Sequence, residues 1–222
     1  MDRHNFFRFS NGDKAKLPFS DKEYENRLKG LKKIINEKNL DAIVLTSMQN
    51  IAYYSGFLYC SFGRPYACVV TSETSTVVSA NIDAGQPGRR CYGNNLIYTD
   101  WERDNYLKAI ISLVKNPKKI GVEKDHLTME KHNIIKDAFN NSEIIDVAHE
   151  TMAQRMIKSN EEIDLIRSGS KIAEIGARAL VKEIKVGARE IDIAMVGRDA
   201  MEKAIADLHP DSELRDTWVW FQ

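Results

Sequence analysis

The spacing of hydrophobic and polar positions changes along the chain, so that segments with a helical period are followed by segments typical of strands. Ser20 begins an amphipathic stretch that runs towards Glu37, with Glu23 three residues after the serine as in a capping box, and Asn39 ends it. Residues 42–46 then form a short apolar run rich in β-branched side chains, which is typical of a strand buried on both faces. A helix followed by a buried strand predicts an α/β layer.

The same two patterns continue to about residue 150. Further strands are predicted at 67–71, 76–80, 96–99, 119–123 and 143–147, and further helices at 105–114 and 128–139. Residues 83–90, rich in Gly, Pro and Arg, are predicted to form a loop. Because a set of adjacent strands precedes the alternation of strands and helices, we predict a mixed sheet with helices on both faces.

The pattern changes near residue 150, where strands disappear. Three helical segments follow, at about 150–157, 161–184 and 189–208. We therefore expect two domains, an N-terminal α/β domain at residues 1–150 and the start of a second domain at residues 151–222.

Aromatic residues alternate with other residues in the last segment of the chain, residues 216–222. Trp218 and Trp220 stand two residues apart, which is the period of a strand. Such large side chains should bury their area against something that the 222 residues lack. We therefore expect this chain to be the front part of a longer protein, whose chemistry lies beyond Gln222.

Charge and hydropathy narrow the classes of function. The 32 Lys and Arg residues are balanced by 32 Asp and Glu residues, so no long-range field favours nucleic acid or an anionic membrane. No stretch approaches the ~20 apolar residues of a membrane span, and the polar N-terminus lacks the apolar core of a signal peptide. We expect a cytoplasmic protein whose partners are small molecules or other protein subunits.

Cysteine and histidine positions suggest no metal site. Cys60, Cys68 and Cys91 lack metal-ligand spacing, and their odd number favours reduced thiols. A catalytic thiol stays open because the chain has five histidines, but none stands in a recognisable arrangement with a cysteine. We therefore interpret the cysteines as small buried hydrophobes and predict neither a metal nor a cofactor. Three isolated histidines support this prediction: His126, His132 and His149.

Several other polar positions receive structural interpretations. Arg89 and Arg90 are interpreted as part of a solvated loop, and Asp104 as the cap of the helix that follows it. His209 is placed at the end of the last helix, where a cation is mildly favourable. The tyrosines at 53–54 are expected to pack inside the N-terminal domain, with hydroxyls that need partners if buried.

Two stretches resemble a known family. Residues 155–159, 161–163 and 166–167, with Gly187 and Glu190 further on, resemble the beginning of the catalytic domain in the pita-bread family, which holds creatinase, prolidase, aminopeptidase P and methionine aminopeptidase. Residues 50–57 resemble the segment after the first strand in the creatinase and prolidase branch. The resemblance implies an N-terminal three-layer α/β/α domain of ribonuclease H-like fold, with a mixed sheet. It also implies that the first helices of a pita-bread α+β catalytic domain follow.

Three more stretches, together with residues 216–222, resemble the creatinase group within that family. They are residues 58–64, 82–87 and 98–101. The resemblance covers essentially the whole chain and implies a homodimeric amidinohydrolase that splits creatine into sarcosine and urea without a metal. It also implies that the catalytic His and glutamates lie beyond Gln222, so that this chain alone is inactive.

The resemblance names two substrate-binding residues. In that group, a Phe and an Arg of this loop contact the substrate while the N-terminal domain leans over the other subunit's active site, and the matching positions here are Phe62 and Arg64. A guanidinium is a natural bidentate partner for the carboxylate of creatine. An aromatic face suits the methylated guanidinium group of creatine.

Two other hypotheses stay open. In the first, the protein acts on another small zwitterion or on an Xaa-Pro peptide, with two metal ions held by downstream side chains, and Arg64 serves those substrates too. In the second, the N-terminal module is a non-catalytic binding or dimerisation domain. Without the resemblance, Arg64 is interpreted as a solvated loop arginine and Phe62 as a core or interface aromatic.

Overall fold

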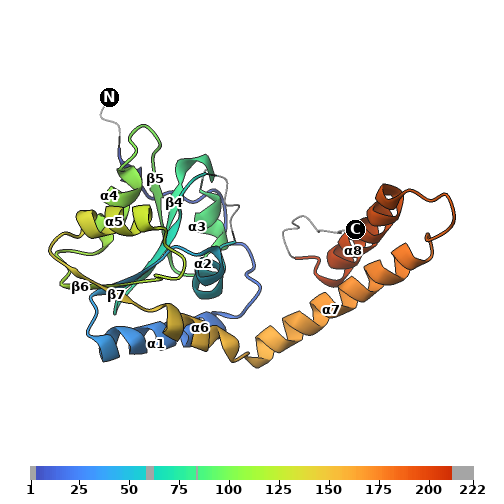
Figure 1. Ribbon diagram of the computed structural model, residues 1–222, viewed down its shortest axis with the longest axis horizontal. Coiled ribbons are helices and arrows are strands. Elements are labelled where there is room, and N and C mark those ends of the chain that lie inside the picture. Colours follow the sequence, from blue (N-terminus) through green and yellow to red (C-terminus); the bar gives the residue numbers. More distant parts are fainter. Residues whose placement is uncertain (1–3, 59–62, 84, 212–222) are drawn as a thin grey trace. The chain divides into compact units, whose positions relative to one another are not determined.

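The computed structural model describes residues 4–58, 63–83 and 85–211, drawn in colour in Figure 1. The chain forms two compact units, Met1–Ile157 and Lys158–Gln222. The division lies after helix α6 (Ala148–Met156), which packs on helix α1 (Asp21–Lys38) of the first unit. The aromatic run at 216–222 and the site candidate Phe62 lie outside the described residues.

A mixed sheet forms the centre of the first unit, as the sequence predicted. Within the described residues it has seven strands in the order β1-β5-β4-β3-β2-β6-β7. The strands are β1 (Phe6–Phe7), β2 (Ala42–Leu45), β3 (Ala67–Val70), β4 (Ser75–Ala80), β5 (Asn94–Tyr98), β6 (Lys119–Val122) and β7 (Glu143–Asp146). Strand β3 is antiparallel to β2 and β4, while β4 and β5, β2 and β6, and β6 and β7 are parallel pairs. Strands β2, β4, β5, β6 and β7 therefore all run in one direction.

Helices cover both faces of this sheet. Besides α1 and α6 they are α2 (Met48–Ser55), α3 (Gln86–Arg90), α4 (Asn105–Leu113) and α5 (Met129–Ala138), with a 3-10 turn at Asn81–Asp83. Helix α1 packs on α6 and α4 packs on α5, and Figure 1 shows these two pairs on opposite sides of the sheet. Because both faces are covered, β2, β3 and β4 are buried along their whole length.

Three elements were not predicted from the sequence. Strand β1 has two residues paired with β5, too few to show a period. Helix α2 begins after Ser47, whose side chain accepts a hydrogen bond from the Asn50 N–H. The loop expected at 83–90 contains helix α3, in which Pro87 stands in the first turn, where a missing N–H costs no helical hydrogen bond.

Helix α1 begins and ends at the residues that the sequence indicated. The Ser20 side chain accepts a hydrogen bond from the Glu23 N–H at 3.2 Å. Asn39 follows the helix in the left-handed region, with φ of 54°.

A buried arginine on α1 joins three segments of the first unit. Arg27, 3% exposed, donates from Nε to Glu23 at 2.8 Å and from Nη1 to the Tyr53 carbonyl at 2.9 Å. Its guanidinium carbon lies 4.1 Å from the centroid of the Phe19 ring and 4.2 Å from that of the Tyr53 ring. Cation–π contact and hydrogen bonding therefore hold the segment before α1 and helix α2 against α1.

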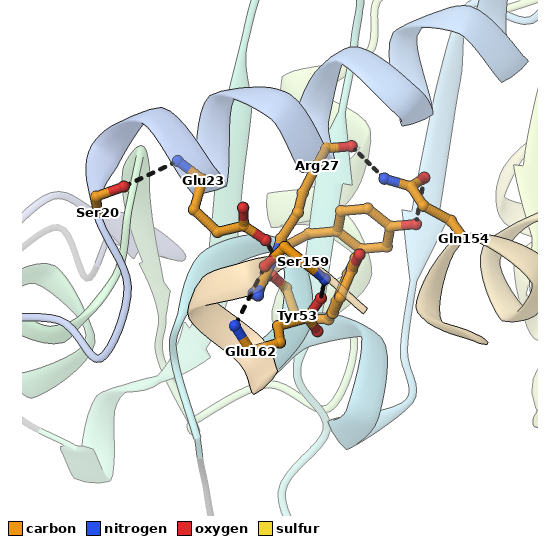
Figure 2. A network of polar contacts seen from close by, with 8 residues as sticks. Ser20, Glu23, Arg27, Tyr53, Gln154, Ser159 and Glu162 are labelled. Atoms are coloured by element: carbon orange, nitrogen blue, oxygen red, sulfur yellow. Dashed lines mark hydrogen bonds and ion pairs between the residues drawn. The ribbon is translucent and has the colours of Figure 1, made fainter. Parts of the chain in front are cut away.

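Helix α6 is attached to α1 and α2 through Gln154 (Figure 2). Its Nε2 donates to the Arg27 carbonyl at 2.8 Å, and its Oε1 accepts from the Tyr54 hydroxyl at 3.0 Å. A Cβ at Gly30 would lie 2.5 Å from the Gln154 amide, so the helices approach more closely than a side chain would allow. The fully buried Tyr54 has the partner that the sequence analysis required.

A buried carboxylate directly after β6 connects three further elements. Glu123, 2% exposed, accepts from the N–H groups of Thr46 at 2.6 Å and Ser47 at 3.0 Å. It also accepts from the Ser47 hydroxyl at 2.5 Å and the Asn50 amide at 2.6 Å. That amide also donates to the Thr151 hydroxyl of α6 at 3.2 Å. One side chain thus connects β6, the β2–α2 turn and, through Asn50, α6.

The second unit contains a pair of helices, α7 (Asn160–Val181) and α8 (Glu190–Leu208). Ser159 and Glu162 form a complete capping box at the start of α7. A Cβ at Gly176 would lie 2.5 Å from the Met201 side chain, so glycine allows the two helices to pack closely. His209 ends α8 as expected, and its Nε2 lies 2.7 Å from the Ser168 hydroxyl of α7.

We predict that Glu123→Ala lowers the free energy of unfolding by about 3 to 5 kcal/mol, because it leaves buried donors without their charged acceptor. The measurement is urea denaturation of the chain. Glu143→Ala is the matched control, since its carboxylate is 58% exposed and pairs with Lys119 at 3.2 Å, a surface pair worth less than about 1 kcal/mol. Equal losses in the two variants would contradict a structural role for Glu123.

Candidate functional site

A cavity of about 830 Å³ opens in the first unit at the carboxyl ends of β2, β5 and β6. Thr46 follows β2, Asp100 follows β5 and His126 follows β6, and each of them lines it. The segment Gly63–Tyr66 and helix α5 contribute further lining residues. In open α/β sheets, ligands bind at the carboxyl ends of the strands. The cavity is therefore the candidate site of this unit.

Arg64, the substrate anchor expected from the resemblance, lines this cavity. It follows Gly63, whose φ of 75° favours glycine, and it precedes Pro65. Its Nε lies 3.0 Å from Oδ1 of Asp100, and 47% of the Arg64 side chain remains exposed. The interpretation of Arg64 as a merely solvated loop residue therefore omits a specific ion pair.

Three tyrosine hydroxyls hold the segment that follows Arg64. Tyr98 donates to the Pro65 carbonyl at 3.0 Å, and Tyr106 donates to the Tyr66 carbonyl at 3.0 Å. The Tyr66 hydroxyl donates to Oδ2 of Asp83 at 2.5 Å. The rings of Tyr98 and Tyr106 pack edge to face, with centroids 5.5 Å apart. The backbone after Arg64 is thus attached to both β5 and α4.

Burial of the Tyr98 hydroxyl favours its protonated, donating form. Burial raises the pKa of the Tyr98 hydroxyl, and Asp100 raises it further, while Arg64 opposes that rise. The hydroxyl therefore stays protonated near neutral pH and donates to the Pro65 carbonyl.

Sequence reasoning did not find Asp100 or these tyrosines as a group. It placed Asp100 only within residues 98–101, one of the stretches that resemble the family, and assigned it no contact. The available signal was that 58–64 and 98–101 both belong to the stretches that carry the family resemblance. Proximity between stretches so far apart in the chain appears only in the folded sheet.

The prediction that Asp104 caps the next helix is confirmed for its position but not for a side-chain hydrogen bond. Asp104 stands at the N-cap of α4 with φ of −87° and ψ of −1°, a helical conformation, and its side chain makes no capping hydrogen bond. The buried Asn105 side chain instead donates to the Thr99 carbonyl at 3.1 Å and the Thr99 hydroxyl at 3.0 Å. These bonds, which link the start of α4 to the end of β5, stabilise the turn.

The interpretation of Arg89 and Arg90 as solvated is wrong. Both residues are half-buried in α3. Arg89 donates from Nε to the Asp13 carbonyl at 3.0 Å and from Nη1 to the Gln86 side chain at 3.2 Å. The first bond attaches the N-terminal segment to α3, the second lies within α3, and together they give Arg89 a structural role.

The two described cysteines are buried thiols without a disulfide, which confirms the sequence interpretation for Cys68 and Cys91. Burial raises the pKa of Cys68 to about 12, partly opposed by the Ser75 hydroxyl. Burial likewise raises the pKa of Cys91 to about 11, opposed by Lys14. Both thiols are therefore protonated near neutral pH, unlike the thiolate that a nucleophile requires. Cys60 lies outside the described residues.

Two further observations on the part of the chain that the structure describes concern metal binding and membrane spans. No group of three His, Cys, Asp or Glu side chains there is arranged to hold a metal ion. No helix in the same ranges combines the length and apolar character needed to cross a membrane.

Comparison of sequences matches the Creatinase/Prolidase N-terminal domain family to residues 27–157. A creatinase from Bacillus sp. (strain B-0618) is 46% identical over 215 residues, which are 95% of this chain and 52% of the creatinase. An Xaa-Pro dipeptidase from Pyrococcus furiosus is 24% identical over 170 residues, which are 77% of this chain and 46% of the dipeptidase. The chain spans about half the length of these curated relatives.

Solved structures share the fold. The prolidase from Pyrococcus horikoshii OT3 has a TM-score of 0.66 at 21% identity, over 80% of this chain and 48% of the prolidase. The X-Pro aminopeptidase from Thermotoga maritima MSB8 has a TM-score of 0.66 at 20% identity, over 80% of this chain and 49% of the aminopeptidase. These likenesses confirm the predicted α/β fold, and at such identities they carry information about the fold alone.

We predict that Cys68 and Cys91 react with a thiol reagent only when the chain unfolds. In a Cys60→Ser background at pH 8, labelling of the native chain should be at least about 100-fold slower than labelling in urea, because burial suppresses the thiolate. Ser10→Cys, which adds a thiol at an exposed position, is the control that reports reagent activity. Rapid native labelling of either buried thiol would contradict the assignment.

Raised thiol pKa values also predict a loss of stability at alkaline pH. Above the ordinary thiol pKa of about 8.5, the unfolded chain releases protons that the folded chain retains, so stability falls by about 1.4 kcal/mol per pH unit for each thiol. The loss ends as pH passes the folded values of about 11 and 12. Urea denaturation at pH 8 and pH 9.5 measures it. The Cys68→Ala and Cys91→Ala variants should each lose less stability over this interval than the parent.

Proposed function

We propose a function from one premise: this chain belongs to the creatinase/prolidase family, whose N-terminal domain it contains. In the full-length protein, we propose, the activity is that of a creatinase-like amidinohydrolase, which converts creatine and water into sarcosine and urea. The observation that carries the proposal is the 46% identity to the Bacillus sp. creatinase over 95% of this chain. The Xaa-Pro dipeptidase relative reaches 24%.

The proposed reaction breaks the bond between the guanidinium carbon of creatine and its methylated nitrogen. The oxygen of water bonds to that carbon, and the nitrogen leaves with a proton as the amine of sarcosine, so general acid–base groups are needed. We propose that a His and carboxylates beyond Gln222 supply the proton transfers and hold the guanidinium group. The residues of this chain would bind and orient the substrate.

Arg64 suits the role of carboxylate anchor. It lines the cavity with about half of its side chain exposed. A guanidinium has five N–H donors, so the contact of Nε with Asp100 is compatible with a carboxylate bound at the terminal nitrogens. Phe62 remains a predicted second contact, facing the methylated guanidinium group of creatine.

We further propose that the full-length protein is a homodimer in which Phe62 and Arg64 reach over the partner's active site. No metal or other cofactor is assigned to this reaction. A cytoplasmic location stays a prediction from the sequence.

A second candidate is a metal-dependent hydrolase of Xaa-Pro peptides. The 24% identical Xaa-Pro dipeptidase relative favours it. Arg64 would then bind the carboxylate of a peptide, and two metal ions would be held by downstream residues. A third candidate is a non-catalytic binding or dimerisation module, in which Arg64 serves no active site.

We predict that the full-length protein releases urea from creatine and that a strong chelator leaves the rate unchanged. The 222-residue chain is the negative control, because loss of general acid–base catalysis alone costs about 10² to 10⁴ in rate. Absence of urea from the full-length protein would contradict the creatinase proposal. Chelator-sensitive cleavage of an Xaa-Pro dipeptide would support the second candidate, and urea from the short chain would contradict the proposed location of the catalytic groups.

We predict that Arg64→Ala raises KM for creatine by about 10- to 100-fold in the full-length protein, because charge-assisted hydrogen bonds contribute about 1.5 to 3 kcal/mol. Steady-state urea release is the measurement. Arg8→Ala, at an exposed arginine that does not line the cavity, is the matched control. Unchanged kinetics in Arg64→Ala would favour the non-catalytic module.

A further inference from the structure

Arg64 is held at two levels, in its backbone and in its side chain. The two carbonyls that follow it along the chain, those of Pro65 and Tyr66, each accept a tyrosine hydroxyl at 3.0 Å. The hydroxyls come from Tyr98 on β5 and Tyr106 on α4, so the segment is attached to elements of the packed core. The Arg64 side chain is then held through the 3.0 Å contact between its Nε and Asp100.

Asp100 and Tyr98 act from the same place in the sheet. Tyr98 is the last residue of β5, and Asp100 stands two residues later, in the turn that follows the strand. Tyr98 bonds the backbone of Pro65, and Asp100 bonds the side chain of the residue before it. The end of β5 therefore sets both the path of this loop and the direction of the arginine side chain.

An arginine side chain has several rotatable bonds, and ordering it costs conformational entropy when a ligand binds. A partner that holds Nε reduces this cost, because a planar guanidinium oriented through one nitrogen presents the others in a defined direction. Asp100 is one-third exposed, so the pair contributes little to stability. The geometry of the pair instead favours a role in orienting the Arg64 guanidinium.

We propose that Asp100 is a positioning residue that orients the Arg64 guanidinium for a substrate carboxylate, on a loop attached through Tyr98 and Tyr106. This inference rests on the proposed function, in which Arg64 binds the carboxylate of creatine. Asp100 itself touches Arg64 and takes no part in proton transfer.

The kinetic test uses Asp100→Asn in the full-length protein. KM for creatine should rise about 5- to 20-fold while kcat changes less than about 3-fold. In an Arg64→Ala background the same substitution should change neither value further. N,N-dimethylguanidine, which lacks the carboxylate, should inhibit the parent and Asp100→Asn with the same constant. Asp100→Glu should recover part of the lost affinity.

Glu143→Gln is the matched control for this experiment. Glu143 does not line the cavity, and its carboxylate makes an exposed ion pair with Lys119 at 3.2 Å. It should leave KM for creatine within about 2-fold of the parent. Equal effects of Glu143→Gln and Asp100→Asn, or additive effects of Asp100→Asn and Arg64→Ala, would overturn the positioning role.

A second measurement tests the same contact without creatine. In ¹⁵N-labelled full-length protein, the Arg64 Nε–H signal, assigned by its absence in Arg64→Lys, should be protected from exchange with water. Asp100→Asn should weaken that protection, because a neutral amide oxygen is a poorer acceptor than a carboxylate, and Glu143→Gln should retain it. Unchanged protection in Asp100→Asn overturns the proposal. A parent protein that releases no urea contradicts the proposed function only, because this readout does not depend on turnover.

Discussion

The buried carboxylate of Glu123 is the interaction on which the first unit depends most. A buried charge is costly unless donors surround it, and here the donors come from the β2–α2 turn and the start of α2. The carboxylate lies at the N-terminus of α2, where a negative charge is favourable. Asn50 extends the contact to Thr151 on α6. Strand β6, the β2–α2 turn and helix α2 are therefore joined at one buried acceptor, and Asn50 joins α6 to them.

The candidate cavity lies beside this junction. Thr46, which donates its N–H to Glu123, also lines the cavity, so the carboxylate helps to shape one wall. The lining also contains Arg64, whose loop is attached by tyrosine hydroxyls to β5 and α4. A loop that carries a binding residue is thus held by rigid elements, which is how binding loops acquire a defined geometry.

The fold assignment and the proposed function of this protein rest on different observations. Prolidase structures share the fold at about one-fifth identity, and a shared fold does not identify a substrate. The creatinase assignment depends instead on sequence likeness along nearly the whole chain. The cavity adds a physical role for Arg64, since a half-exposed guanidinium beside a carboxylate partner has donors suited to a substrate carboxylate.

The sequence by itself determined the local elements and the class of fold. Caps at Ser20 and Ser159, and apolar runs such as β2, act between neighbours in the chain, so they can be read directly. Arg64 was found because its segment resembles that of known relatives. Tertiary structure alone decided that Asp100 lies beside Arg64, that Glu123 binds a turn 76 residues away, and that Asn105 rather than Asp104 holds its turn. The physical reason is that these contacts depend on strand order and burial, which join residues that no local period relates.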